Sequence, residues 1–170
     1  PAWLRSSGDD SKAAHLRQPL LSRHGLFALP LYCERRPMVG IVVIAHAPLA
    51  SALSQCAEHV YTCEPNARRQ LRALDVDGGA DLANTVALAR ELVREVDRGE
   101  GVLILTDAFG ATPGNVAAQL AESERVAVLA GVNLPMLLRA VCYRGGPLEE
   151  VTEKALAGGR QGMLQVAAAR

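Results

Sequence analysis

A histidine and an aspartate each stand at the end of an apolar segment of this sequence. His46 follows the apolar run 39–45, and Asp107 follows the run 102–105 and one threonine. Both runs have the length and composition of buried strands. If these strands lie side by side in a parallel sheet, their carboxyl ends meet at one edge and bring the two side chains together. An aspartate that accepts a hydrogen bond from Nδ1–H leaves a lone pair on Nε2, so the pair predicts a nucleophilic histidine.

The loop after Asp107 contains residue types that suit an anionic ligand. We expect Thr112 to cap a helix whose first residue is Pro113. Because proline has no N–H, Gly114 and Asn115 are the expected backbone donors at this helix start, with the Thr112 hydroxyl beside them. A phosphoryl group needs such donors, since its oxygens carry the negative charge. The pattern therefore predicts reversible phosphorylation of the histidine.

Other residues at the same predicted edge are candidates for lining the site. Phe109 and Gly110 lie in the loop after the aspartate, and Asn133 follows the apolar run 126–129. Asn133 could instead serve only as a strand-to-helix turn. The sequence contains no nucleotide-binding GxxxxGK[ST] or GxGxxG motif, and no GxSxG or HExxH motif. We therefore expect no cofactor and no metal, and we expect the phosphoryl donor to be another protein.

The composition argues against several classes of protein. The chain has 170 residues, a formal net charge of zero and few aromatic residues. It therefore lacks the basic surface and the stacking platforms that bind nucleic acids. No apolar stretch reaches the roughly twenty residues of a membrane-spanning helix, so we expect no direct membrane insertion. The 4 cysteines have no metal-binding spacing, which favours reduced thiols in a cytoplasmic protein.

From Met38 onward, short apolar segments alternate with amphipathic ones, which is the pattern of an α/β fold. It predicts a doubly wound, mainly parallel sheet of about four to five strands flanked by helices. Expected strands are 39–45, 71–74, 102–106, 126–129 and a strand-like segment near 163–166. Expected helices are 49–61, 82–96 with Asp81 as its cap, one from Thr112, one from Pro135 to about Tyr143, and one near 148–157.

The first 37 residues differ from this pattern, because they show no sustained period. We interpret residues 1–37 as an upstream translated or expression-derived extension outside the fold, and residues 38–170 as the domain. The alternative is that the extension is a docking or regulatory arm.

From Met38 to about Gly162 the chain resembles the mannose-type enzyme IIA components of the bacterial phosphoenolpyruvate-dependent sugar phosphotransferase system. The resemblance rests on three segments: MVGIVVIAH (38–46), GVLILTDAFGATPGN (101–115) and GVNLPML (131–137). It implies a phosphohistidine carrier, in which His46 accepts a phosphoryl group from the phosphocarrier protein HPr. The recipient would be a separate IIB component that serves a membrane IIC/IID permease.

The resemblance also implies roles for other residues and an assembly. Asp107 would be the carboxylate bonded to the active histidine, and Thr112 the hydroxyl near the phosphate. The family resemblance implies a homodimer in which a C-terminal strand is exchanged between subunits, and the matching strand would lie near 162–167.

Two segments depart from the usual pattern of similar proteins. Those proteins carry glycine directly after the histidine, whereas Ala47 and Pro48 stand here, and Pro48 cannot donate a backbone hydrogen bond. Their loop has two glycines before Thr-Pro and a serine after it, whereas Ala111 and Gly114 stand in those places. Alanine is less free than glycine to adopt a positive φ. These changes concern the phosphate loop and leave the nucleophile and the carboxylate intact.

Other functions fit parts of the same pattern. A relay used purely for regulation, or the phosphoryl donor component for dihydroxyacetone kinase, would use the same histidine, although the loop 109–113 favours the mannose type. A non-catalytic protein-binding module would keep the fold without the chemistry. A small-molecule hydrolase or transferase would use His46 and Asp107 as a general base.

Overall fold

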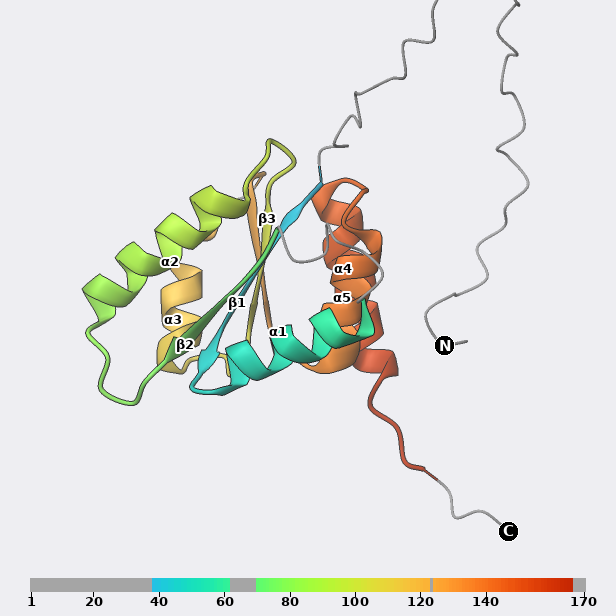
Figure 1. Ribbon diagram of the computed structural model, residues 1–170, viewed down its shortest axis with the longest axis horizontal. Coiled ribbons are helices and arrows are strands. Elements are labelled where there is room, and N and C mark those ends of the chain that lie inside the picture. The colour runs from blue at the N-terminus through green and yellow to red at the C-terminus, as the bar shows by residue number, and fades with distance from the viewer. Residues whose placement is uncertain (1–37, 62–69, 123, 167–170) are drawn as a thin grey trace, which may run out of the picture. The chain divides into compact units, whose positions relative to one another are not determined.

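Four parallel strands form one sheet within the part of the chain that the structure describes. The computed structural model describes residues 38–61, 70–122 and 124–166. Within them the strand order is β2-β1-β3-β4, and all neighbours are parallel (Figure 1). The strands are β1 (Gly40–His46), β2 (Leu71–Val76), β3 (Val102–Thr106) and β4 (Val126–Ala130). The predicted parallel sheet is confirmed, whereas the predicted extension 1–37 lies outside the described residues.

Helices cover both faces of this sheet, as expected for a doubly wound fold. α2 and α3 lie on one face, and α1, α4 and α5 lie on the other (Figure 1). The core on the first face joins Val42 and Ile44 of β1 to Val86 of α2 and Val116 of α3. The helices are α1 (Leu49–Val60), α2 (Leu82–Val96), α3 (Thr112–Ala118), α4 (Leu134–Tyr143) and α5 (Leu148–Gln161).

The two central strands are fully buried along most of their length. Every side chain of residues 41–45 and 102–105 is 0% exposed. Parallel strands that carry helices on both faces have no solvent-facing side, which is why these runs are apolar at every position. Burial ends at His46, which is exposed, and decreases at Asp107, which is partly buried. The apolar composition of the two strands therefore places both polar residues, His46 and Asp107, at the edge of the sheet.

Two predictions near the C-terminus are corrected by the structure. α5 continues past the predicted end at 157, because Gly158 and Gly159 pack closely against α4. A Cβ added to Gly159 would lie 2.7 Å from Cε of Met136, so the glycine permits the contact. Residues 163–166, predicted as a strand, have no regular secondary structure and are exposed. A strand needs a neighbouring edge for its hydrogen bonds, and no described strand of this chain pairs with this segment.

Two further observations concern the cysteine thiols and the possibility of membrane-spanning helices. Cys56 and Cys142 are free thiols and are exposed. Cys33 and Cys63 lie outside the described residues. Across the described ranges, none of the helices has the length and apolar character required to cross a membrane.

Candidate functional site

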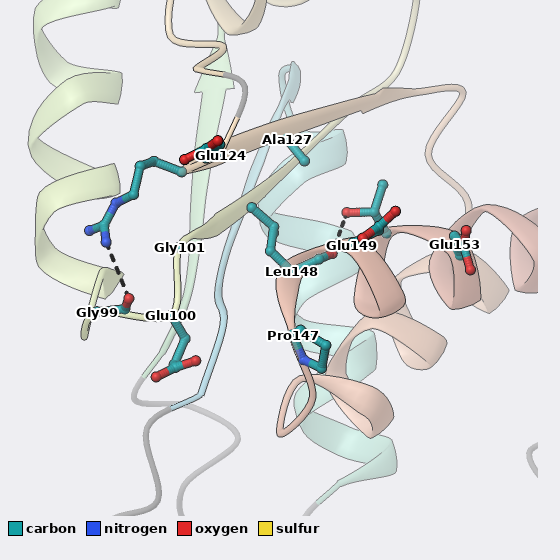
Figure 2. Close-up of a pocket in the computed structure, with 11 residues that line it drawn as sticks. Gly99, Glu100, Gly101, Glu124, Ala127, Pro147, Leu148, Glu149 and Glu153 are labelled. Carbon is teal, nitrogen blue, oxygen red and sulfur yellow. Dashed lines mark hydrogen bonds between the residues drawn. The ribbon is translucent and has the colours of Figure 1, made fainter.

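A surface pocket lies at the amino ends of β3 and β4, on the opposite edge from the predicted site. Its volume is about 670 Å³, and the carboxylates of Glu100, Glu124, Glu149 and Glu153 surround it (Figure 2). None of the predicted site residues lines it. Parallel sheets bind ligands at the carboxyl ends of their strands. The candidate site is therefore the carboxyl edge of the sheet, not the edge that holds this pocket. The described residues also contain no group of three or more His, Cys, Asp or Glu side chains placed to hold a metal ion.

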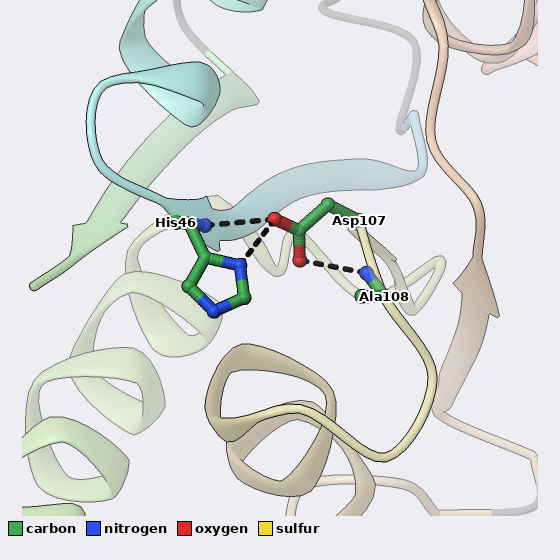
Figure 3. A network of polar contacts seen from close by, with 3 residues as sticks. All are labelled: His46, Asp107 and Ala108. Carbon is green, nitrogen blue, oxygen red and sulfur yellow. Dashed lines mark hydrogen bonds and ion pairs between the residues drawn. The ribbon is translucent and has the colours of Figure 1, made fainter. Parts of the chain in front are cut away.

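At the carboxyl edge, the structure brings the predicted histidine and aspartate into direct contact. β1 and β3 are neighbours, and their register ends with Ile44 opposite Thr106. Oδ2 of Asp107 accepts a hydrogen bond from the backbone N–H of His46 at 3.0 Å and lies 2.7 Å from ring Nδ1 (Figure 3). An ionised carboxylate can only accept, so Nδ1 is the atom that carries the proton. The second ring nitrogen, Nε2, points away from the carboxylate (Figure 3).

The surroundings of Asp107 favour its ionised form. Its side chain is only 14% exposed, whereas that of His46 is 49% exposed. Partial burial by itself raises the pKa of Asp107. The hydrogen bonds that the carboxylate accepts from the backbone and ring of His46 and from the Ala108 N–H have the larger combined effect, so the pKa of Asp107 lies below its ordinary value. The Ala108 N–H donates to Oδ1 at 2.7 Å (Figure 3). The aspartate therefore carries a stable negative charge beside the ring and holds the Nδ1–H tautomer.

The predicted phosphate loop forms the start of α3, but its cap differs from the prediction. Ala111, not Thr112, is the N-cap, because its backbone is extended and its carbonyl accepts the Asn115 N–H at 2.9 Å. Thr112 is the first helical residue and is exposed. The Asn115 N–H is thus used within the helix, and its side-chain Nδ2 donates to Gly110 O at 3.4 Å. The first-turn backbone donors that remain are those of Thr112 and Gly114.

Two departures from the usual loop sequence have a structural explanation. Ala111 has a φ of −81°, so this position needs no glycine. Gly110 has a φ of +84°, a conformation that other residues rarely adopt. A Cβ added to Gly114 would lie 2.6 Å from the carbonyl oxygen of Ala108, so the loop as folded here excludes a side chain at 114. Phe109, between these residues and the aspartate, is 94% exposed.

Asn133 caps a helix at the same edge. Its side chain accepts a hydrogen bond from Met136 N–H at 2.9 Å and donates to Gly159 O at 3.2 Å. Nearby, Gly131 N–H donates to the carbonyl of Asp107 at 2.9 Å. The end of β4 therefore supports the backbone of the aspartate, while the Asn133 side chain joins α4 to α5.

A further carboxylate at this edge belongs to a residue that the sequence analysis did not single out. β2 extends to Val76, beyond the predicted end at 74, so Asp75 belongs to the strand. Its Oδ1 accepts the backbone N–H of Ser51 in α1 at 3.1 Å. The only sequence signal for this contact is an aspartate near the carboxyl end of a neighbouring strand.

The fold and the site define a doubly wound α/β protein with a histidine–carboxylate pair at the carboxyl edge of its parallel sheet. Residues 40–156 match the EIIA-man family model, described as the PTS system fructose IIA component, and the chain belongs to this family. The resemblance stated from the sequence is thus confirmed.

Individual relatives agree with this assignment. The chain is 30% identical over 108 residues to the PTS system fructose-specific EIIA component of Bacillus subtilis (strain 168), covering 63% of this chain and 71% of that protein. It is 27% identical over 128 residues to the PTS system mannose-specific EIIAB component of Escherichia coli (strain K12), covering 74% of this chain but only 38% of that longer protein. The crystal structure of phosphotransferase system component EIIA from Streptococcus agalactiae superposes with a TM-score of 0.63 at 26% identity, covering 75% of this chain and 97% of that one.

Proposed function

We propose that this protein is a phosphoryl carrier of a sugar phosphotransferase system and that His46 carries the phosphoryl group. The observation that supports this most is the 2.7 Å contact between ring Nδ1 and Asp107, which leaves Nε2 as the free nitrogen of a half-exposed ring. Membership of the IIA family supports the same chemistry. The proposal assigns this function to the predicted domain, residues 38–170, and to the cytoplasm.

The proposed step is a direct transfer between two proteins. The lone pair of Nε2 attacks the phosphorus of the phosphorylated donor, for which we propose HPr. A bond forms between Nε2 and phosphorus, and the bond from phosphorus to the donor nitrogen breaks, with its electron pair returning to that nitrogen. The ring of His46 gains positive charge while Nδ1 keeps its proton, and Asp107 stabilises that charge. The reverse chemistry passes the phosphoryl group to a separate IIB component that serves a IIC/IID permease.

The phosphoryl oxygens need donors near Nε2, and two helix starts flank the histidine. At the start of α1, a backbone donor is already used by the protein itself, because the Ser51 N–H donates to the Asp75 carboxylate at 3.1 Å. That leaves the loop before α3, where we propose that the hydroxyl and N–H of Thr112, the N–H of Gly114 and the side chain of Asn115 contact the phosphoryl group. Phe109, Gly110 and Asn133 remain candidates for lining the site.

We also propose that the working form is a homodimer that exchanges residues near 162–167. Met163, Leu164 and Val166 are 69%, 71% and 83% exposed, which is unusual for three apolar side chains so close together. Among the described strands, β4 pairs only with β3, so its other edge is open to a further strand beyond the isolated bridge between Glu122 and Val126.

The test is phosphorylation of the purified protein. It is incubated with phosphoenolpyruvate, enzyme I and HPr, and the product is assayed for an acid-labile, base-stable phosphoryl adduct. We expect the adduct in the wild type and in His59→Ala, which replaces an exposed histidine of α1, and no adduct in His46→Ala. An adduct in His46→Ala at the wild-type level would refute the proposal. Failure of the wild type to react would favour a non-catalytic binding module.

A further inference from the structure

We propose that Asp75 is a positioning residue for His46, a role that rests on the function proposed above. Asp75 lies in β2, which is the neighbour of β1 on the side opposite β3. Its Oδ1 accepts the N–H of Ser51, the third residue of α1, at 3.1 Å. α1 begins only three residues after the histidine. The bond therefore anchors the end of the short turn that connects His46 to α1.

The start of α1 needs an acceptor from elsewhere in the chain. Its N-cap is Pro48, which makes no side-chain capping hydrogen bond. The carbonyl of Pro48 accepts the Ser51 hydroxyl at 3.0 Å and the Ala52 N–H at 3.1 Å. The N–H of Ser51 is one of the first-turn donors that a helix cannot satisfy by itself. Asp75 supplies the missing cap across the sheet, and its negative charge suits the helix N-terminus.

The same strand also holds the backbone next to the histidine. Ala45 is in register with Asp75, and His46 with Val76. Ala47 N–H donates to the carbonyl of Val76 at 3.1 Å, so the pairing of β1 with β2 continues past the end of β1. The turn after His46 is therefore attached to β2 at both of its ends.

Two carboxylates thus hold the histidine segment from opposite sides. Asp107 of the β3 side binds the backbone and ring of His46, and Asp75 of the β2 side binds the beginning of α1. Asp107 contacts the reacting ring, whereas Asp75 acts only through the backbone. Misplacement of a reacting group by about 1 Å can slow a reaction about a hundredfold, so loss of the second attachment is expected to reduce the transfer rate.

The chain offers a matched control for this idea. Asp81 caps α2 in the same way, because its Oδ2 accepts the Asn84 N–H at 2.8 Å. This cap lies at the same edge of the sheet, but the loop before α2 carries no predicted nucleophile. Asp75→Ala and Asp81→Ala therefore each remove a carboxylate cap from a helix start, and only the first helix follows His46.

The experiment compares Asp75→Ala, Asp75→Asn, Asp81→Ala and wild type in the full chain. It measures the rate of phosphoryl acceptance over a range of phosphorylated HPr concentrations, the thermal unfolding midpoint, and the ¹⁵N NMR shifts of the His46 ring and amide. We expect Asp75→Ala to lower the maximal rate about ten- to a hundredfold with little change in KM, and to move the His46 resonances. Asp75→Asn keeps an acceptor oxygen and should restore most of the rate.

The control should separate positioning from stability. Asp81→Ala is expected to lower the unfolding midpoint as much as Asp75→Ala does, but to leave the rate and the His46 resonances at wild-type values. Equal rates in these two variants would overturn the inference, and so would an Asp75→Asn rate as low as that of Asp75→Ala. If the wild type itself forms no adduct, the proposed function fails, which is a distinct result.

Discussion

Asp107 holds His46 through one carboxylate oxygen that accepts both the backbone N–H, at 3.0 Å, and ring Nδ1–H, at 2.7 Å. The backbone bond fixes where the histidine emerges from the strand, and the ring bond fixes which nitrogen is free. A single side chain from the neighbouring strand therefore sets both the position and the tautomer of the proposed nucleophile.

The first prediction concerns the charge of this carboxylate. Asp107→Asn keeps the size of the side chain but removes the charge that, in the proposed transfer, stabilises the phosphorylated ring, so the rate of adduct formation should fall at least about a hundredfold. The rate is measured with phosphorylated HPr as donor. Asp77→Asn, which changes an exposed aspartate in the loop after β2, should react at the wild-type rate. Equal rates in both variants would show that Asp107 has no part in the transfer.

The second prediction concerns pH. The pKa of Asp107 is lowered in the folded protein, so its carboxyl carbon should titrate in ¹³C NMR below the ordinary value of about 3.9. A lowered folded-state pKa means that the stability contributed by this group is present above the unfolded value and is lost as the pH falls through the folded value. Titration of the carboxyl above the ordinary range would contradict the hydrogen-bonded geometry.

The third prediction concerns Phe109, whose ring is 94% exposed in the loop after the aspartate. Because it contributes little to the core, Phe109→Ser should change the free energy of unfolding by less than about 0.5 kcal/mol. An exposed aromatic side chain near a nucleophile is a suitable contact for a protein donor, so KM for phosphorylated HPr should rise. Leu88→Ser, at a 50% exposed position in the middle of α2, serves as the control and should leave KM unchanged. A KM that is equally unaffected in both variants would exclude Phe109 from the contact.

The fourth prediction concerns the loop glycine at 114. Gly114→Ser introduces a Cβ that would lie 2.6 Å from the Ala108 carbonyl oxygen, so the loop must shift. We expect a loss of about 1–3 kcal/mol in the free energy of unfolding, measured by urea denaturation. Ala111→Gly, at a position with a φ of −81°, should change it by less than about 1 kcal/mol. An unchanged stability in Gly114→Ser would mean that the loop accommodates a side chain without rearrangement.

The fifth prediction concerns the exposed apolar residues after α5. If they pair with a second subunit, Leu164→Asp should convert a dimer into a monomer without unfolding the chain. The mass in solution is measured by light scattering after size-exclusion chromatography, and helix content by circular dichroism. Gln165→Asp, which alters a neighbouring polar residue, should remain dimeric. A monomeric wild type would rule out the exchange, whatever the variants do.

Much of the fold and the central pair of the site could be predicted from the sequence. One continuous apolar run ends directly before His46, and another ends at Leu105, with one threonine between it and Asp107. Short runs of this kind are typical of strands that are buried on both faces and that end where their burial ends. Asp81 was predicted correctly as a helix cap, because a cap and the N–H that it accepts are close in sequence. These features are local, so composition and spacing determine them.

The remaining contacts depend on which strands are neighbours and in what register. Asp75 caps α1 from a strand that follows it in the chain, and this contact exists only because β2 pairs with β1. The Asn133 side chain donates a hydrogen bond to a backbone carbonyl of α5. The cap of α3 also differs from the prediction by one residue, since Ala111 rather than Thr112 is the N-cap. The sequence alone thus determined that a histidine and an aspartate end two buried strands. Only the tertiary structure decided that both neighbouring strands hold the histidine segment, because hydrogen bonds between distant residues follow from strand order and register rather than from local pattern.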